Sequence, residues 1–83
     1  MMMAKDLLER IAVNPLVMLG KPVIRGTRIT VEILLEKIAA GFSMDEILVD
    51  YPRLSREDVL AAVAYAREVI STDELIPRIQ TAR

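Results

Sequence analysis

Apolar residues recur every three or four positions between residues 31 and 39, which is the spacing of one buried face of an α-helix. Thr30 precedes this stretch and is a candidate N-cap. Gly41 follows it and permits the left-handed backbone that ends many helices. The pattern therefore predicts a helix between Thr30 and Gly41, with a buried stripe made of Val31, Leu34, Leu35, Ile38 and Ala39.

Two further helix starts show a serine followed three residues later by an acid. Ser43 with Glu46, and Ser55 with Asp58, have the spacing of a capping box. Pro52 lies between the two starts and ends the first of these helices. The pattern predicts a short helix after Ser43 and a longer one after Ser55, with an apolar stripe made of Val59, Ala62, Val63, Ala66 and Ile70.

The first thirty residues favour extended structure. Residues 5–12 fit either a short helical turn or an extended segment, and periodicity does not decide between them. Residues 11–13 and 16–19 look extended and are separated by the turn signal Asn14-Pro15. Residues 23–24 and 29–31 look like two short β pieces around a turn. The whole pattern predicts a mainly α fold, with three helices in helix-turn-helix order after a short β element.

The length and composition of the chain indicate a single small domain. We expect one domain over residues 1–83, with its core in residues 11–70 and a C-terminal tail in residues 71–83. An apolar content of 53% is high for 83 residues. We therefore expect part of the apolar surface to lie against another chain, most simply in a homodimer. A densely packed monomer is the alternative.

Several classes of function find no support in the composition. The chain has no Cys and no His, so thiolate chemistry and the commonest general base and metal ligand are absent. No segment resembles a signal peptide, and no apolar run reaches the roughly 18 residues that span a bilayer. Capping and the helix dipole account for the acids at the helix starts. We expect a cytoplasmic protein that is not an enzyme, binds no cofactor and contacts no membrane.

Positive charge is concentrated just before the first of the three helices. Lys21, Arg25 and Arg28 lie in residues 20–31, which contain no acid, whereas the net charge of the chain is −1. Arg and Lys supply most phosphate contacts, so this segment could act as an arm against double-stranded DNA. The alternative is structural: the glycines set a turn, and the arginines pair with acids of the next helix. Arg28 with Glu32 is then the expected pair.

In a helix-turn-helix unit the second helix of the pair reads the bases, and here that helix starts at Ser55. It opens with Arg56, Glu57 and Asp58. Two carboxylates near phosphates are unfavourable, and only Arg53 and Arg56 favour contact with DNA. We therefore favour a structural role for this helix and keep the two arginines as candidate phosphate contacts.

A second candidate surface is apolar. Leu60, Tyr65 and Val69 lie off the buried stripe of the last helix, and the tail adds Leu75, Ile76 and Ile79. Such residues could form a self-association face or fill the groove of a partner protein. The alternative is additional core that packs against the β element.

Three blocks of sequence together resemble a known family. They are GKPVIRGTR at residues 20–28, GFSMDEIL at 41–48 and DYPRLSREDV at 50–59, followed by Ala64-Tyr65-Ala66. Over about residues 11–70 the chain resembles the bacterial and archaeal family catalogued as domain of unknown function 433. The resemblance implies a homeodomain-like, winged-helix-related fold. For many members it also implies the role of an antitoxin paired with a PIN-like ribonuclease, and it carries over no catalytic residue.

Three hypotheses of function follow. In the first, the chain is an antitoxin: residues 75–83 cover a PIN-like ribonuclease toxin, and residues 21–28 bind operator DNA as part of a homodimer. In the second, it is a DNA-binding regulator without a toxin. In the third, it is an adaptor that binds only protein, and the basic turn has a structural role.

Overall fold

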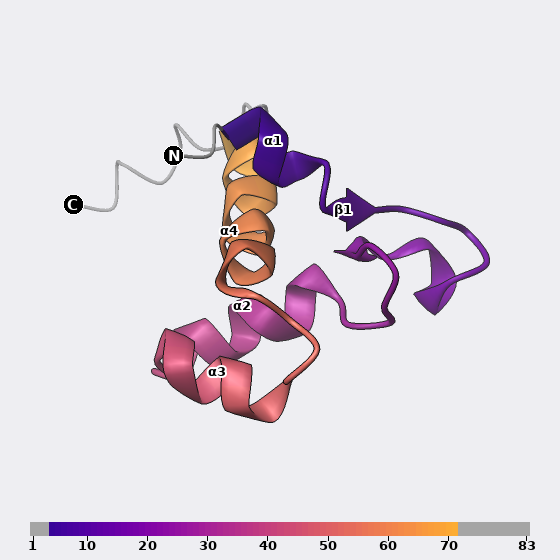
Figure 1. Ribbon diagram of the computed structural model, residues 1–83. Helices are drawn as coiled ribbons and strands as arrows, with labels where there is room; N and C mark the ends of the chain where they lie inside the picture. The colour runs from indigo at the N-terminus through magenta and orange to yellow at the C-terminus, as the bar shows by residue number, and fades with distance from the viewer. Residues whose placement is uncertain (1–3, 72–83) are drawn as a thin grey trace.

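The computed structural model describes residues 4–71 and confirms a mainly helical fold with a short β element before the three predicted helices. Figure 1 shows the helices gathered on one side and the β element projecting from them. The elements are α1 (Ala4–Leu8), β1 (Ile11–Ala12), the 3-10 segment η1 (Met18–Gly20), β2 (Val23–Ile24), α2 (Val31–Ala39), α3 (Met44–Asp50) and α4 (Arg56–Ser71).

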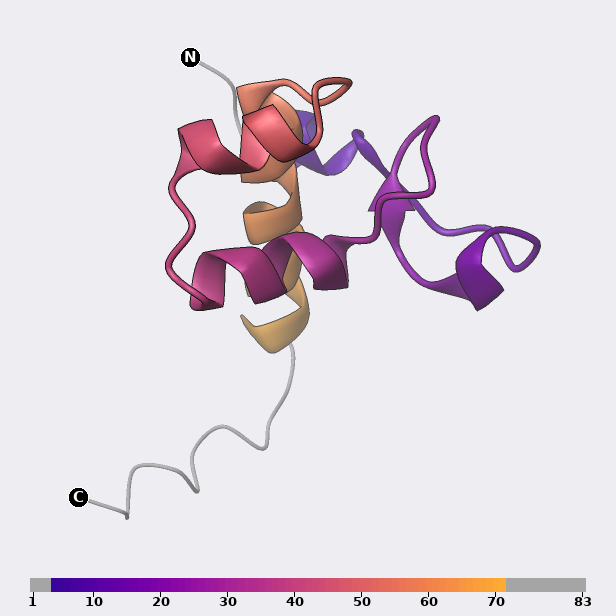
Figure 2. The ribbon, with the colours of Figure 1, turned by 90° about the horizontal axis from the view of Figure 1, so that it is seen from below.

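Helix α4 is the central element of the fold, since it contacts α1, α2, α3 and β1. Figures 1 and 2 show α3 near the start of α4, and α2 lies beside the C-terminal half of α4, where Leu35 lines a groove with Tyr65 and Val69. Val59, Ala61 and Ala62 of α4 are almost completely buried, together with Leu34 of α2 and Ile47 of α3. The small alanine side chains leave room for neighbouring elements to pack closely on this face of α4.

The predicted start and end of α2 are both confirmed. The Thr30 hydroxyl accepts a hydrogen bond from the Ile33 backbone N–H at 3.0 Å, which satisfies one of the free donors of the first turn. Gly41 has a φ of 97°, a conformation that residues with a Cβ rarely adopt, and it follows the last turn of the helix.

The two predicted capping boxes are also present. Glu46 accepts from the Ser43 N–H at 2.8 Å, and the Ser43 hydroxyl accepts from the Glu46 N–H at 3.1 Å. At the start of α4, Asp58 accepts from the Ser55 N–H at 3.0 Å, and the Ser55 hydroxyl accepts from the Asp58 N–H at 3.2 Å. Asp58 also pairs with Arg10 at 3.0 Å, which links α4 to the segment between α1 and β1.

Strands β1 and β2 form an antiparallel pair in which Ile11 faces Ile24 and Ala12 faces Val23. Residues 5–12, which periodicity left undecided, therefore contain both a helix and a strand. Residues 29–31 make only a bridge from Thr30 to Val23, so a third strand was a wrong prediction. The reason is local: Thr30 already caps α2, and the chain turns into the helix at once.

The prediction that residues 16–19 are extended is wrong. The backbone N–H of Val17 donates to Asn14 O, and that of Gly20 donates to Val17 O, so the segment turns twice. Met18 and Leu19 have φ values of 49° and 58°, in the left-handed region. That conformation costs roughly 1–2 kcal/mol for each residue with a Cβ. These hydrogen bonds, and not burial of side chains, determine the shape of the loop.

The predicted apolar stripes are buried only in part. Ile38 and Ala39 at the end of α2 are exposed, as are Val63 and Ile70 of α4. The prediction also placed Tyr65 off the buried face, but this side chain is half-buried and packs against the core. The face of α4 that includes Ala61 and Ala62 lies against the core, which places Val63 outside it.

Replacing Asp58 tests the junction between α4 and the segment before β1. Asp58→Ala removes the capping acceptor and the ion pair with Arg10, so we expect the free energy of unfolding to fall by about 1–2 kcal/mol in urea denaturation. Asp45→Ala is the matched control, because Asp45 also lies in a first helical turn but its side chain is 90% exposed. The control is expected to change stability by less than about 0.5 kcal/mol. Equal losses in both variants would contradict this role of Asp58.

Candidate nucleic-acid interface

A groove of about 620 Å³ lies beside the β element. Its walls come from the loop after β1, the turn after β2 and the link between α3 and α4. Two of the lining residues are arginines, and none is acidic; the lining consists of Ala12, Asn14, Val17, Val23, Gly26, Thr27, Arg28, Ile29 and Arg53. We call this surface the basic groove.

Arg28 is one of the two exposed cations of the basic groove. It lies in the turn that is closed by the hydrogen bond from the Ile24 N–H to Ile29 O at 2.9 Å. Within residues 4–71, its side chain makes no ion pair or hydrogen bond. The predicted pair with Glu32 is wrong, because Glu32 binds Lys21 at 3.0 Å instead. Arg28 is therefore available to an anion without loss of an internal contact.

Arg53 reaches the same groove from the link before α4. Its Nη2 lies 3.5 Å from the carbonyl oxygen of Gly26, a long and weak hydrogen bond. Gly26 itself has a φ of 81° and open space where a Cβ would be, so the backbone of the turn is accessible. The sequence separates Arg28 and Arg53 by 25 positions, and the packing of the α3–α4 link against the turn brings them together.

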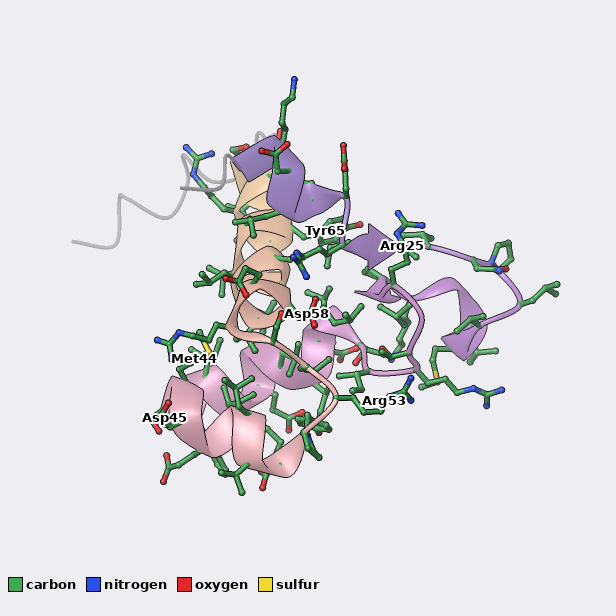
Figure 3. All side chains as sticks on the ribbon, viewed as in Figure 1. Arg25, Met44, Asp45, Arg53, Asp58 and Tyr65 are labelled. Atoms are coloured by element: carbon green, nitrogen blue, oxygen red, sulfur yellow. The ribbon has the colours of Figure 1, made fainter. Side chains whose placement is uncertain are left out.

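Arg25 has a structural role despite its exposure. Its Nε donates to Glu9 O at 2.8 Å, and its Nη2 donates to Ile11 O at 3.1 Å. These bonds fasten the turn after β2 to the segment before β1. Figure 3 shows Arg25 beside β1 and Arg53 at the other end of the β element.

Lys21 and Arg56 lie outside the basic groove, and each has an acidic partner. The Lys21–Glu32 pair is largely exposed, and Arg56 pairs with Asp45 at 3.6 Å. In Figure 3, Asp45 lies on the opposite side of the helices from Arg53. The five cations predicted from the sequence therefore do not share one surface: only Arg28 and Arg53 meet in the groove.

Two contributors to the site were missed from the sequence. Asn14 and Val17 line the basic groove, although the segment that contains them was predicted only as a turn and an extended piece. The dipeptide Asn14-Pro15 marked the turn, but no sequence signal indicated that it folds against the turn after β2. Arg10 was also missed, and it makes the half-buried ion pair with Asp58.

Asp58 at the start of α4 has a structural role. Asp58 is held by Ser55 and Arg10, and α4 packs against α2. The acids at the helix starts act locally: Glu46 and Asp58 accept hydrogen bonds from the caps. Across residues 4–71, no three side chains of Asp, Glu, His or Cys type are placed to hold a metal ion. None of the helices in that range is both long and apolar enough to cross a membrane.

The predicted apolar interface residues are distributed over different surfaces. Leu60 and Val69 are both about half exposed, but nine residues of helix place them on opposite sides of α4. Tyr65 and Val69 line a second groove, which is largely apolar and lies between α2 and α4. Leu75, Ile76 and Ile79 lie outside the described residues.

Comparison with known proteins gives the family. The model of a family described as protein of unknown function (DUF433) matches residues 11–66, more than half of the chain. The chain belongs to the DUF433 family. A solved structure of a DUF433 member protein from Anabaena variabilis ATCC 29413 is 34% identical, with a TM-score of 0.72. The match covers 82% of this chain and 67% of that one.

An uncharacterised protein of Sinorhizobium fredii (strain NBRC 101917 / NGR234), y4eO, is similar over a shorter stretch. It is 36% identical over 58 residues, which are 70% of this chain and 26% of the relative. The chain thus spans about a quarter of the length of that relative. These comparisons establish the DUF433 fold and family, and the family itself is one of unknown function.

The different roles of Arg25 and Arg28 predict different losses in the free energy of unfolding when each is replaced. Arg25→Ala removes two hydrogen bonds from a charged group to backbone carbonyls, so we expect the free energy of unfolding to fall by about 1–2 kcal/mol. Arg28→Ala removes no internal contact and is expected to change it by less than about 0.5 kcal/mol. Chemical denaturation of the two variants under one condition compares them directly. A larger loss for Arg28→Ala would show that Arg28 supports the fold.

Proposed function

We propose that this DUF433 protein is a non-catalytic binding module whose basic groove holds the phosphate backbone of double-stranded DNA. The observation that supports this proposal most directly is the meeting of Arg28 and Arg53 in a groove without acidic lining. Both guanidinium groups are solvent-accessible, and neither has an acidic partner among residues 4–71. A phosphate can therefore bind without displacing a carboxylate.

The chemistry of the groove favours backbone contacts over base readout. Guanidinium groups bind phosphate oxygens through paired N–H donors, and the turn at Gly26 lets a strand approach the protein backbone closely. Helix α4 opens with Arg56, Glu57 and Asp58, and its two carboxylates disfavour a place against phosphates, so we do not assign it to the major groove. Contacts to phosphates give affinity and position but little sequence preference. We expect binding that depends on salt and only weakly on DNA sequence.

The role in which we place this module is that of an antitoxin. The similarity of its sequence blocks to the DUF433 family supports that role, and the basic groove would serve the operator-binding half of it. The ribonuclease partner would meet a different surface, the segment of residues 75–83 proposed from the sequence. The alternative role is a DNA-binding regulator without a toxin. It would use the same basic groove but would have no ribonuclease partner.

Salt dependence tests the groove. Two arginines that neutralise two phosphates predict a log–log slope of about −1.8 for each chain bound, at about −0.9 for each phosphate. We expect Arg28→Ala and Arg53→Ala each to make the slope shallower by about 0.9, and the double variant to lose most of its affinity. Fluorescence anisotropy of a labelled duplex over a salt series measures the slope.

Arg67→Ala is the matched control for the salt series. Arg67 is also an exposed arginine, but it lies on α4 outside the groove. The Arg67→Ala variant should have the same affinity for the duplex and the same salt slope as the unaltered protein. Binding that is insensitive to salt, or equal losses in the control and the groove variants, would refute a phosphate-binding groove.

Co-expression tests the antitoxin role separately. We expect the chain to relieve growth arrest caused by a PIN-like ribonuclease encoded beside its gene, and to co-elute with it on a sizing column. Replacing Leu75, Ile76 and Ile79 with Asp should abolish both effects, because the partner would bury these apolar side chains. Val49→Asp, which alters an exposed apolar residue of α3, is the control and should retain both. Rescue that survives the triple replacement would exclude this segment as the toxin-binding surface.

A further inference from the structure

The loop between β1 and β2 supplies one wall of the basic groove, through Asn14 and Val17. Figures 1 and 2 both show this loop projecting away from the helices. Besides the two arginines, Asn14 and Thr27 bring polar side chains to the lining. The Thr27 hydroxyl donates to Ile24 O at 2.7 Å, so its proton is already used. This leaves Asn14 as the one uncharged side chain of this lining that can donate to a ligand.

The Asn14 amide is used on one side only. Its Oδ1 accepts from the Leu16 N–H at 2.8 Å, so the oxygen faces the loop. Within residues 4–71, its Nδ2 makes no hydrogen bond. An amide nitrogen carries two donors, and phosphate oxygens accept hydrogen bonds. The basic groove therefore has a neutral donor in addition to its two arginines.

The backbone of the loop is strained in a way that fixes the place of Asn14. Met18, Leu19 and Gly20 have φ values of 49°, 58° and 81°, so three successive residues turn the chain back. A Cβ added to Gly20 would lie 3.7 Å from the Cα of Pro15, the residue after Asn14. Left-handed backbone is costly for residues with a Cβ, and strain of this kind collects at functional sites. Here the strained segment closes the loop next to Asn14.

We propose that Asn14 is the third phosphate contact of the basic groove, in addition to Arg28 and Arg53. This inference rests on the proposed DNA-binding function and adds a residue that is not among the cations predicted from the sequence. Asn side chains contact phosphates in protein–DNA complexes, as Arg side chains do. Because the amide carries no charge, it adds affinity without releasing a further counterion. A salt series therefore distinguishes Asn14 from the two arginines.

The engaged oxygen limits what Asn14 recognises. An asparagine that reads adenine uses its amide oxygen and nitrogen together. In this chain the Leu16 N–H holds the oxygen, so only the nitrogen is free for a ligand. A donor alone binds any phosphate oxygen. Asn14 therefore supports binding that depends only weakly on DNA sequence.

Asn14→Asp tests the free side of the amide. The variant keeps an oxygen for the Leu16 N–H and replaces the NH₂ group with a second oxygen, so the midpoint of urea unfolding should stay unchanged. We expect the dissociation constant for the labelled duplex to rise at least about tenfold, because a donor to a charged group is lost and a carboxylate takes its place. The salt slope should become shallower, since the carboxylate opposes the charge of the arginines.

Asn14→Ser removes the amide donors without adding a charge. A serine hydroxyl can still accept from the Leu16 N–H, because serine forms the same kind of turn. We expect the dissociation constant to rise about fivefold, with the salt slope unchanged at about −1.8. Arg28→Ala, by contrast, changes both quantities. A purely structural role for Asn14 would lower the urea midpoint and leave the affinity of the folded protein unaltered, which would overturn the proposal.

Leu16→Asp is the matched control for charge. It introduces the same negative charge on the same loop, but Leu16 is 92% exposed and does not line the basic groove. Its carboxylate should remain in solvent, where salt screens it. We expect this control to bind the duplex within about twofold of the unaltered protein. Equal losses for Leu16→Asp and Asn14→Asp would overturn the proposal, since they would show general repulsion and no contact at Asn14.

The arginine variants separate this inference from the function on which it rests. If Arg28→Ala and Arg53→Ala weaken binding while both Asn14 variants bind as the unaltered protein does, Asn14 is not a contact and the DNA-binding proposal stands. If binding does not depend on salt, or the arginine variants bind normally, both proposals fail. A rise in the dissociation constant for both Asn14 variants, with the urea midpoint unchanged and the control unaffected, is the result that we expect.

Discussion

The structure depends on how Asp58 joins the helices to the β element. This carboxylate caps α4 through the Ser55 N–H and pairs with Arg10, and the carbonyl of Arg10 accepts from the Arg25 N–H at 2.7 Å. One side chain therefore connects the central helix to the segment before β1 and, through Arg10, to the turn after β2. The core of such a small chain is limited, so a half-buried polar junction of this kind has a large share in orienting the projecting element.

That junction also explains why neighbouring cations have different roles. Arg25 lies close to it and donates to two backbone carbonyls, so its charge is used in holding the turn. Arg28, three residues later, lies within the turn that the Ile24–Ile29 hydrogen bond closes, and it lines the basic groove with Arg53. A rigid turn allows this division, since one arginine fixes the backbone from which the other extends. The DNA-binding proposal depends on Arg28, and the stability of the turn that carries Arg28 depends on Arg25.

The small size of the chain also explains why apolar side chains remain exposed. Short helices cannot cover all of their apolar residues, and the C-terminal ends of α2 and α4 extend past the core. The loop between the strands adds leucines that no part of residues 4–71 covers. The tip of this loop and the basic groove share Val17, whereas the largely apolar groove between α2 and α4 lies on a different surface.

Local signals in the sequence determined the helical part of the fold. Thr30, Ser43 and Ser55 fix helix starts through hydrogen bonds to residues three positions away, and Gly41 ends α2. Such interactions depend only on neighbours in the chain, so their spacing is visible in the sequence. The extended segments at residues 11–12 and 23–24 were also predicted, but their pairing was not, because the sequence pattern placed residues 23–24 and 29–31 around one turn.

The tertiary structure alone decided which cation is free and which apolar residues are covered. Lys21 rather than Arg28 reaches Glu32, and Arg53 meets Arg28 across 25 positions of sequence, because packing of the α3–α4 link sets those distances. The left-handed turn at Met18 and Leu19 has no sequence signal, since its hydrogen bonds involve backbone groups that every residue carries. Spacing along a chain predicts contacts within one element, whereas contacts between elements depend on how those elements pack.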